Sequence, residues 1–264
     1  MIRPGLCSVT FRDLSPQQVV DHAARAGLVG IEWGGDVHVP PGDTKTAEQV
    51  RDLTEQAGLA VASYGSYLRF DGEDRAHQVE ADSVLAVARA LQAPRVRVWA
   101  GSAGSRETPA EERERITERI RAFAAQAGRS GIEVGLEFHG NTLTDEVGST
   151  LRLLEETDRD GAEPEEGRVR TYWQPPQDMP DESALETLRA VLPRTSSIHV
   201  FSWWPGSTRL PLAERSELWR RAFDILRAEG SPRDALLEFV PGDDPALLAR
   251  EAATLRDLLD TAPG

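Results

Sequence analysis

Two stretches of the chain place a glutamate inside an apolar run, directly before a phenylalanine. One is Gly-Leu-Glu-Phe-His-Gly at 135–140, and the other is Leu-Leu-Glu-Phe-Val-Pro-Gly at 236–242. An isolated buried carboxylate is unfavourable, and two carboxylates that share a site repel each other. A divalent cation relieves both problems, because it binds glutamate oxygen and histidine nitrogen readily. Glu137 and Glu238 are therefore candidate metal ligands and candidate acid–base groups.

Two further apolar runs carry a polar side chain near their carboxyl ends. Side chains alternate across a strand, so every second residue faces the same side. In the run at 196–201 this alternation turns His199 inward, and in the run at 169–174 it turns Gln174 inward. Any one such residue is explained by a structural ion pair, whereas four at corresponding strand ends favour a metal site.

The same alternation predicts how the two glutamate strands are oriented. Glu137 and Glu238 are expected to point into the interior of a barrel. Phe138 and Phe239 are expected to point outward, toward the surrounding helices.

The elements that position these residues follow one repeated pattern. A short apolar run is followed by a polar loop and then by an amphipathic stretch that often ends in glycine. Such alternation of strand and helix predicts a parallel sheet. We expect eight strands near 6–10, 29–33, 60–64, 95–99, 133–138, 169–173, 197–201 and 235–239, and eight helices near 15–26, 46–57, 75–91, 111–129, 147–157, 181–191, 214–229 and 244–259.

Eight such units predict an α/β fold, a single (β/α)8 TIM barrel domain over residues 1–264. A doubly wound open sheet is the alternative, but neither a G-x-G-x-x-G after a strand nor a phosphate-binding P-loop occurs in the sequence. Barrel enzymes keep their chemistry at the carboxyl ends of the strands. The ends of strands five to eight would form one arc there.

The order glutamate, acidic or amide residue, histidine, glutamate on strands five to eight resembles the xylose isomerase-like TIM barrels. This family includes ketose 3-epimerases, hydroxypyruvate isomerase, inosose dehydratase and endonuclease IV. The resemblance runs from Gly-Leu-Val-Gly-Ile-Glu-Trp at 27–33 to the run that ends at 242. It implies one divalent metal, Mn, Mg, Co or Zn, bound by Glu137, Gln174, His199 and Glu238. Many members have aspartate in place of Gln174, so Asp178 is an alternative ligand.

The activity that the resemblance implies is that of a metal-dependent sugar isomerase or epimerase. A proton next to a carbonyl would be moved through an enediolate, with the two glutamates as acid and base. The substrate would be a small sugar or a polyol-derived ketone. A dehydratase or C-glycoside lyase on the same enolising site is an alternative, and so is a non-catalytic sugar-binding barrel. An endonuclease IV-like phosphodiesterase needs more histidines than the five present.

Other polar and aromatic residues near the strand ends are candidates for substrate contact. Trp99 and Trp203 could stack on a sugar face, although packing at the barrel mouth is the simpler alternative. Glu32 and Arg97 are expected to face each other inside the barrel as a structural pair, with substrate contact as the alternative. The complete set of candidate substrate-binding residues is His38, Arg97, His139, Trp99, Trp203 and Arg209.

Composition narrows the choice of partners. The chain has 30 basic and 44 acidic residues, a net charge of −14, which disfavours nucleic acid and anionic membrane surfaces. Cys7 is the only cysteine, so an internal disulfide is excluded.

The chain begins without a signal-peptide pattern and has no long apolar segment, so we expect a cytoplasmic protein. The acidic stretch 155–168 is expected to be a solvated linker away from the site, and the oligomeric state, a homo-oligomer included, is left open.

Overall fold

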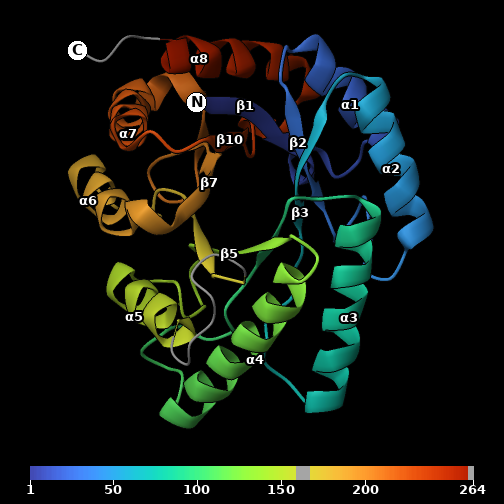
Figure 1. Ribbon diagram of the computed structural model, residues 1–264. Helices are drawn as coiled ribbons and strands as arrows, with labels where there is room; N and C mark the ends of the chain where they lie inside the picture. The colour runs from blue at the N-terminus through green and yellow to red at the C-terminus, as the bar shows by residue number, and fades with distance from the viewer. Residues whose placement is uncertain (159–166, 261–264) are drawn as a thin grey trace.

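The computed structural model describes residues 1–158 and 167–260. Eight parallel strands close into a barrel, and helices surround it (Figure 1). The barrel strands are β1 (Ile2–Cys7), β2 (Gly30–Gly34), β3 (Ala60–Gly65), β4 (Arg95–Val98), β5 (Glu133–Glu137), β6 (Arg170–Trp173), β7 (Thr195–Val200) and β10 (Arg233–Leu237). The helices between and after them are α1 (Pro16–Arg25), α2 (Thr44–Gln56), α3 (Asp74–Ala90), α4 (Ala110–Gly128), α5 (Val147–Thr157), α6 (Asp181–Val191), α7 (Ser216–Glu229) and α8 (Leu248–Asp260). The predicted (β/α)8 barrel is confirmed.

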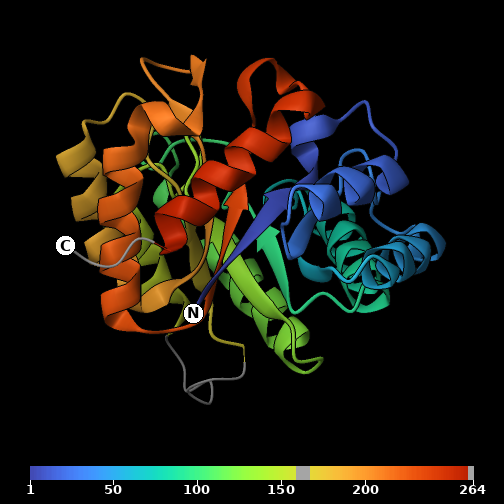
Figure 2. The same ribbon diagram turned by 90° about the horizontal axis from the view of Figure 1, so that it is seen from above.

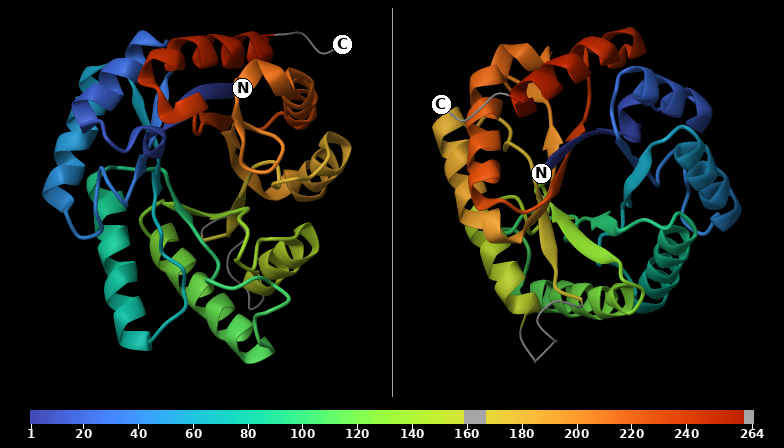
Figure 3. Two further views of the ribbon diagram at one scale, coloured as in Figure 1. Left: turned by 180° about the vertical axis from the view of Figure 1, so that it is seen from behind. Right: turned by 45° about the horizontal axis from the view of Figure 1, so that its top comes forward.

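The ring closes where the two ends of the chain meet. β1 pairs with β10 on one side and with β2 on the other, always in parallel. The last helix, α8, lies beside β1 and α1 (Figures 1 and 3). Seen from above, the strands lie between helices on either side (Figure 2). None of the helices in the described ranges is long and apolar enough to cross a membrane.

The barrel has a large outer core and a small inner one. Outward residues such as Leu6, Ile31 and Leu136 pack against the helices. The inner cluster is much smaller and includes Cys7, Ala62, Tyr172 and Leu236. Inward-facing Gly135 makes room for one of these side chains, because a Cβ there would lie 2.3 Å from the Tyr172 ring. Because Gly135 has no side chain, Tyr172 fits inside the barrel one layer below Glu137. Gly135 thus helps to set the space available at the level of Glu137.

Two expectations about the strands are wrong. β1 occupies residues 2–7 instead of 6–10, and Ser8–Phe11 form a 3-10 helix. β10 ends at Leu237, and Phe239 adopts a left-handed backbone with φ 57°. Since alternation holds only within a strand, Phe239 does not turn toward the helices as predicted. It packs against Trp203, with ring centroids 5.3 Å apart.

The segment after β7 adds an element that the sequence did not indicate. A short antiparallel hairpin pairs β8 (Ser202–Trp203) with β9 (Arg209–Leu210) at the carboxyl end of the barrel. The acidic linker predicted at 155–168 falls largely on 159–166, which lie outside the described residues.

A cluster of ion pairs lies at the amino-terminal end of the barrel strands. The buried carboxylate of Asp234, on β10, accepts hydrogen bonds from Arg3 at 2.8 Å and Arg95 at 2.5 Å. On the neighbouring strands, Glu133 pairs with Arg170 at 2.8 Å. We refer to Arg3, Arg95 and Asp234 as the basal ion cluster.

Candidate active site

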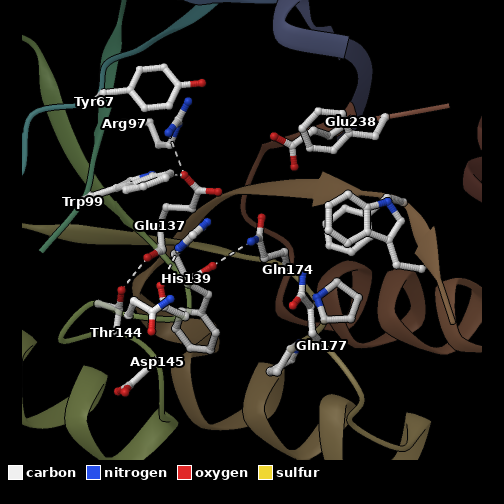
Figure 4. Close-up of a pocket in the computed structure, with 18 of the residues that line it drawn as sticks. Tyr67, Arg97, Trp99, Glu137, His139, Thr144, Asp145, Gln174, Gln177 and Glu238 are labelled. Carbon is white, nitrogen blue, oxygen red and sulfur yellow. Dashed lines mark hydrogen bonds and ion pairs between the residues drawn. The ribbon is translucent and has the colours of Figure 1, made fainter. Parts of the chain in front are cut away.

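Most of the residues predicted to form the site line a cavity of about 470 Å³ at the carboxyl ends of the strands (Figure 4). It is lined by side chains from several different strands and loops, as is usual for a barrel active site. The predicted residues that line it are Arg97, Trp99, Glu137, His139, Gln174, Trp203 and Glu238. His199 lies beneath it and is completely buried.

The other three predicted metal ligands converge on His199. Its Nδ1 lies 3.0 Å from Gln174 Oε1, 3.5 Å from Glu238 Oε2 and 3.6 Å from Glu137 Oε1. Two ligands bound to one ion at about 2.1 Å and at right angles are about 3 Å apart, and slightly more in a tetrahedral site. Each of these oxygens therefore lies at about the distance from His199 that two ligands of one divalent cation have. In the described ranges, the acidic, histidine and cysteine side chains whose ligand atoms already lie within 4.8 Å of one another are Cys7, His199 and Glu238.

Glu137 is held by two donors from the neighbouring strand and the loop after it. Its Oε2 accepts a hydrogen bond from Arg97 Nη1 at 2.7 Å and another from Trp99 Nε1 at 2.5 Å (Figure 4). Burial alone would raise the pKa of Glu137. The Arg97 guanidinium and His199 outweigh that effect and hold the pKa well below its usual value. Glu137 is thus a fixed, ionised carboxylate.

Glu238 has the opposite environment. Within the described ranges, no side chain donates a hydrogen bond to its carboxylate, and its ion-pair neighbour is His199 at 3.5 Å. Burial raises the pKa of Glu238 to about 7, and the charge of Glu137 adds to this effect while His199 opposes it. In the metal-free protein this carboxyl group therefore gains and loses its proton near neutral pH.

Glu32 and Arg97 form the predicted pair, with Arg97 Nε 3.3 Å from Glu32 Oε1. Burial would raise the pKa of Glu32, but His199 and Arg97 lower it to about 2. Arg97 thus contacts both Glu32 and Glu137, and it also faces the cavity.

Cys7 is a site residue that the sequence analysis did not single out. It lies inside the barrel, and its sulfur, a His199 nitrogen and a Glu238 oxygen are all within 4.8 Å of one another. Burial raises the pKa of the Cys7 thiol far above its usual value, so the thiol is neutral. With β1 at residues 2–7, strand alternation turns Cys7 into the barrel. The expected range of 6–10 was too late to predict this orientation.

Two groups of aromatic residues form the walls of the cavity. His139 stacks on Trp99 with ring centroids 4.0 Å apart, and Arg69 covers the Trp99 ring at 4.1 Å. Across the cavity, Trp203 contacts Phe201 at 4.9 Å and Phe239 at 5.3 Å. Flat apolar surfaces therefore flank the polar donors.

Two of the predicted substrate-binding residues, His38 and Arg209, do not line the cavity. Both nitrogens of His38 are engaged below the surface, with Ser8 Oγ at 2.9 Å and the Leu14 carbonyl at 3.1 Å. Arg209 pairs with Asp243 and packs over Phe239 at 4.4 Å.

The alternative ligand, Asp178, is likewise directed elsewhere. It is exposed and accepts a hydrogen bond from the Gly206 N–H at 2.6 Å. Gln174 is fixed in the site instead, because its Nε2 donates to the Phe138 carbonyl at 2.7 Å and its Oε1 faces His199.

Arg12 and Tyr67 are lining residues that the sequence reasoning missed. Arg12 donates to Asp36 at 3.0 Å and to the Tyr67 hydroxyl at 3.2 Å. Both residues lie in segments after strands, where side chains no longer alternate regularly. The alternation rule therefore could not predict that they line the cavity.

Comparison with known proteins shows the family to which the chain belongs. Residues 20–164 match the family model of xylose isomerase-like TIM barrels. The chain belongs to this family. A 3-dehydroshikimate dehydratase of Bacillus anthracis is 31% identical over 160 residues, which cover 58% of this chain and 57% of that protein. The match thus spans little more than half of that relative.

Solved structures of the family share the whole fold. A probable 3-DHS dehydratase from Bacillus anthracis superimposes with a TM-score of 0.77 at 21% identity, covering 97% of this chain and 99% of that one. A 3-keto-D-glucoside 4-epimerase from E. coli gives 0.73 at 15% identity, covering 97% and 100%. A Mycobacterium smegmatis member in complex with magnesium gives 0.69 at 17% identity, covering 97% of each chain. Relatives of this fold are therefore enzymes of more than one reaction class.

Proposed function

We propose that this protein is a divalent-metal-dependent enzyme that removes a proton next to the carbonyl of a small polyhydroxylated ketone. Glu137, Gln174, His199 and Glu238 would hold the ion. The observation that carries this proposal is the convergence of three side-chain oxygens within 3.0–3.6 Å of His199 Nδ1 beside a cavity. When bound, the ion would polarise the carbonyl and stabilise the enolate charge.

The two glutamates have different roles in this proposal. Glu137 is bonded by Arg97 and Trp99 and stays ionised, so it orients and balances charge. Glu238 receives no side-chain hydrogen bond within the described ranges, so in this proposal it is the group that takes the proton. His139 and Trp99 would orient the substrate from one wall, and Trp203 from the other.

A single mobile proton acceptor favours elimination of water over inversion of a stereocentre. Glu238 removes the proton next to the carbonyl, and the enolate expels the hydroxyl on the next carbon. The departing hydroxide takes the proton back from Glu238, so the net change is loss of one water. The sequence relative named as a 3-dehydroshikimate dehydratase supports this reaction class.

Epimerisation or isomerisation is the second candidate. Glu137 Oε1 lies 3.6 Å from His199 Nδ1 and is not the oxygen that Arg97 and Trp99 bind. It could therefore serve as a second proton carrier on the substrate.

The test uses chelator-treated protein reloaded separately with Mg, Mn, Co or Zn. Each sample is incubated in heavy water with 3-dehydroshikimate, ketoses and keto-glycosides. We expect metal-dependent loss of water, seen with 3-dehydroshikimate as the ultraviolet absorption of a dihydroxybenzoate. Deuterium uptake without loss of water would favour the second candidate. Absence of both, in a protein that binds metal, would overturn the proposed chemistry.

A further inference from the structure

Glu32 lies on the side of His199 opposite the other three proposed ligands. His199 Nε2 is buried and makes no hydrogen bond of standard geometry in the described part of the chain. Glu32 Oε1 lies 3.4 Å from it. The nitrogen that faces the ligand oxygens is the other one, Nδ1. The two faces of one imidazole therefore have separate partners.

The position of Glu32 is fixed by its own contacts. Ser63 Oγ donates to Glu32 Oε2 at 2.6 Å, and Arg97 Nε lies 3.3 Å from Oε1. Ser63 reaches the carboxylate because the pairing of β2 and β3 shifts between Ile31 and Glu32, which places Ser63 opposite Glu32. A regular register would have placed Ala62 there, without a hydroxyl group. Both Glu32 and Ser63 are buried.

Resting on the metal site proposed above, we propose that Glu32 is a positioning residue for His199. When bound, the ion would take the place of the Nδ1 proton, which in the metal-free protein is donated to Gln174 Oε1 at 3.0 Å, and the Glu32 carboxylate would accept the Nε2 proton. A neutral imidazole has only one nitrogen that can accept, and a carboxylate behind a ligating histidine selects which one it is. Arg97 extends the arrangement, since the same guanidinium binds Glu32 through Nε and Glu137 through Nη1.

The experiment compares metal affinity in the wild type, Glu32→Gln and Asp234→Asn by calorimetric titration with Mn²⁺. Asp234 is the matched control, because it is also a buried carboxylate inside the barrel with arginine partners, but in the basal ion cluster. We expect Glu32→Gln to weaken Mn²⁺ binding by about 10–100-fold, the effect usual for residues behind a metal ligand. Asp234→Asn should stay within about threefold of the wild type.

A second measurement separates positioning from general stability. In Mg²⁺-loaded, ¹⁵N-labelled protein, the His199 Nε2 proton should give a slowly exchanging NMR signal that moves or is lost in Glu32→Gln. If Glu32→Gln does not fold, Ser63→Ala keeps the carboxylate but removes its fixed partner, and we expect a smaller loss of affinity, about threefold to tenfold.

The outcomes are distinct. Equal Mn²⁺ affinity in Glu32→Gln and wild type, or in Ser63→Ala and wild type if only that variant folds, would overturn the role of Glu32. An equal loss in Asp234→Asn would overturn it as well, because the effect would then be general. A wild-type protein that binds no divalent metal would overturn the proposed function itself.

Discussion

Glu137 and Glu238 lie in the same tripeptide, Leu-Glu-Phe, at the carboxyl ends of two barrel strands, yet their surroundings are opposite. β4, beside β5, and the residue that follows it supply Arg97 and Trp99 to Glu137. The strands beside β10 supply Cys7 and His199, and neither is a permanent cation. The neighbouring strands, and not the local sequence, thus decide which carboxylate is held ionised and which can exchange a proton.

The largest expected effect is on turnover. Glu238→Gln should lower kcat by about 10²–10⁴-fold at saturating metal, because it removes the proton acceptor. Glu137→Gln should also lower activity, but part of its loss should be recovered at higher metal concentration. Steady-state rates measured over a metal titration distinguish the two patterns. A Glu238→Gln enzyme with more than about a tenth of the wild-type rate would show that Glu238 is not the acid–base group.

In metal-free protein the two substitutions should change stability in opposite directions. Glu137→Gln leaves Arg97 buried with a weaker partner and should cost about 3–5 kcal/mol. Glu238→Gln removes a carboxylate whose pKa is raised from 4.5 to about 7, so it should stabilise the fold by up to about 3 kcal/mol.

The sign of the Glu238 effect depends on pH. Ionisation of a group with a raised pKa opposes folding, so the penalty is absent below pH 4.5, grows toward pH 7 and is complete above it. Denaturant unfolding of chelator-treated variants at pH 5 and pH 8 measures this change. Shifts of both variants in the same direction at pH 8 would contradict the contrast between the two sites.

Metal binding should release protons in a pH-dependent number. In the metal-free protein the pKa of Glu238 is about 7. Burial lowers the pKa of His199, but Cys7, Glu238 and Glu32 outweigh it and hold that pKa well above its usual value. Binding should therefore displace the Glu238 proton at pH 6 but not at pH 8, so the number of protons released falls by about one over this range and affinity rises less steeply with pH above 7. Calorimetry in buffers of different ionisation enthalpy counts the protons released. If that number is the same at pH 6 and pH 8, the pKa of Glu238 is not near 7 in the metal-free protein.

The smallest expected effect comes from Gln174→Asp. The substitution adds a negative charge beside the cation but loses the hydrogen bond from Gln174 Nε2 to the Phe138 carbonyl. We expect metal to bind more tightly by up to about tenfold, or about 1.4 kcal/mol. Titration of both proteins with Mn²⁺ provides the measurement. Unchanged affinity would mean that Gln174 does not contact the ion.

The sequence predicted the barrel and most of the site because strand alternation is a strict geometric rule. Glu137, Gln174 and His199 face inward as that rule requires. The rule failed where a strand ended earlier than expected, as at Phe239, and where the first strand was placed too late, which concealed Cys7. Loop residues such as His38 follow no period, so their contacts depend on the folded chain. The pairing of Arg97 with both Glu32 and Glu137 likewise depends on distances across the barrel.

The basal ion cluster has a consequence for kinetics. Asp234 bound by Arg3 and Arg95 lies across the amino-terminal end of the barrel, and Tyr172 and Leu236 fill the interior next to it. In the described chain the reaction chamber therefore opens only at its mouth. Under the proposed function, substrate and product would use this same opening, so a product molecule would have to leave before the next substrate could enter. If the proposed function holds, accumulated product should act as a competitive inhibitor, and a high substrate concentration should restore the full rate.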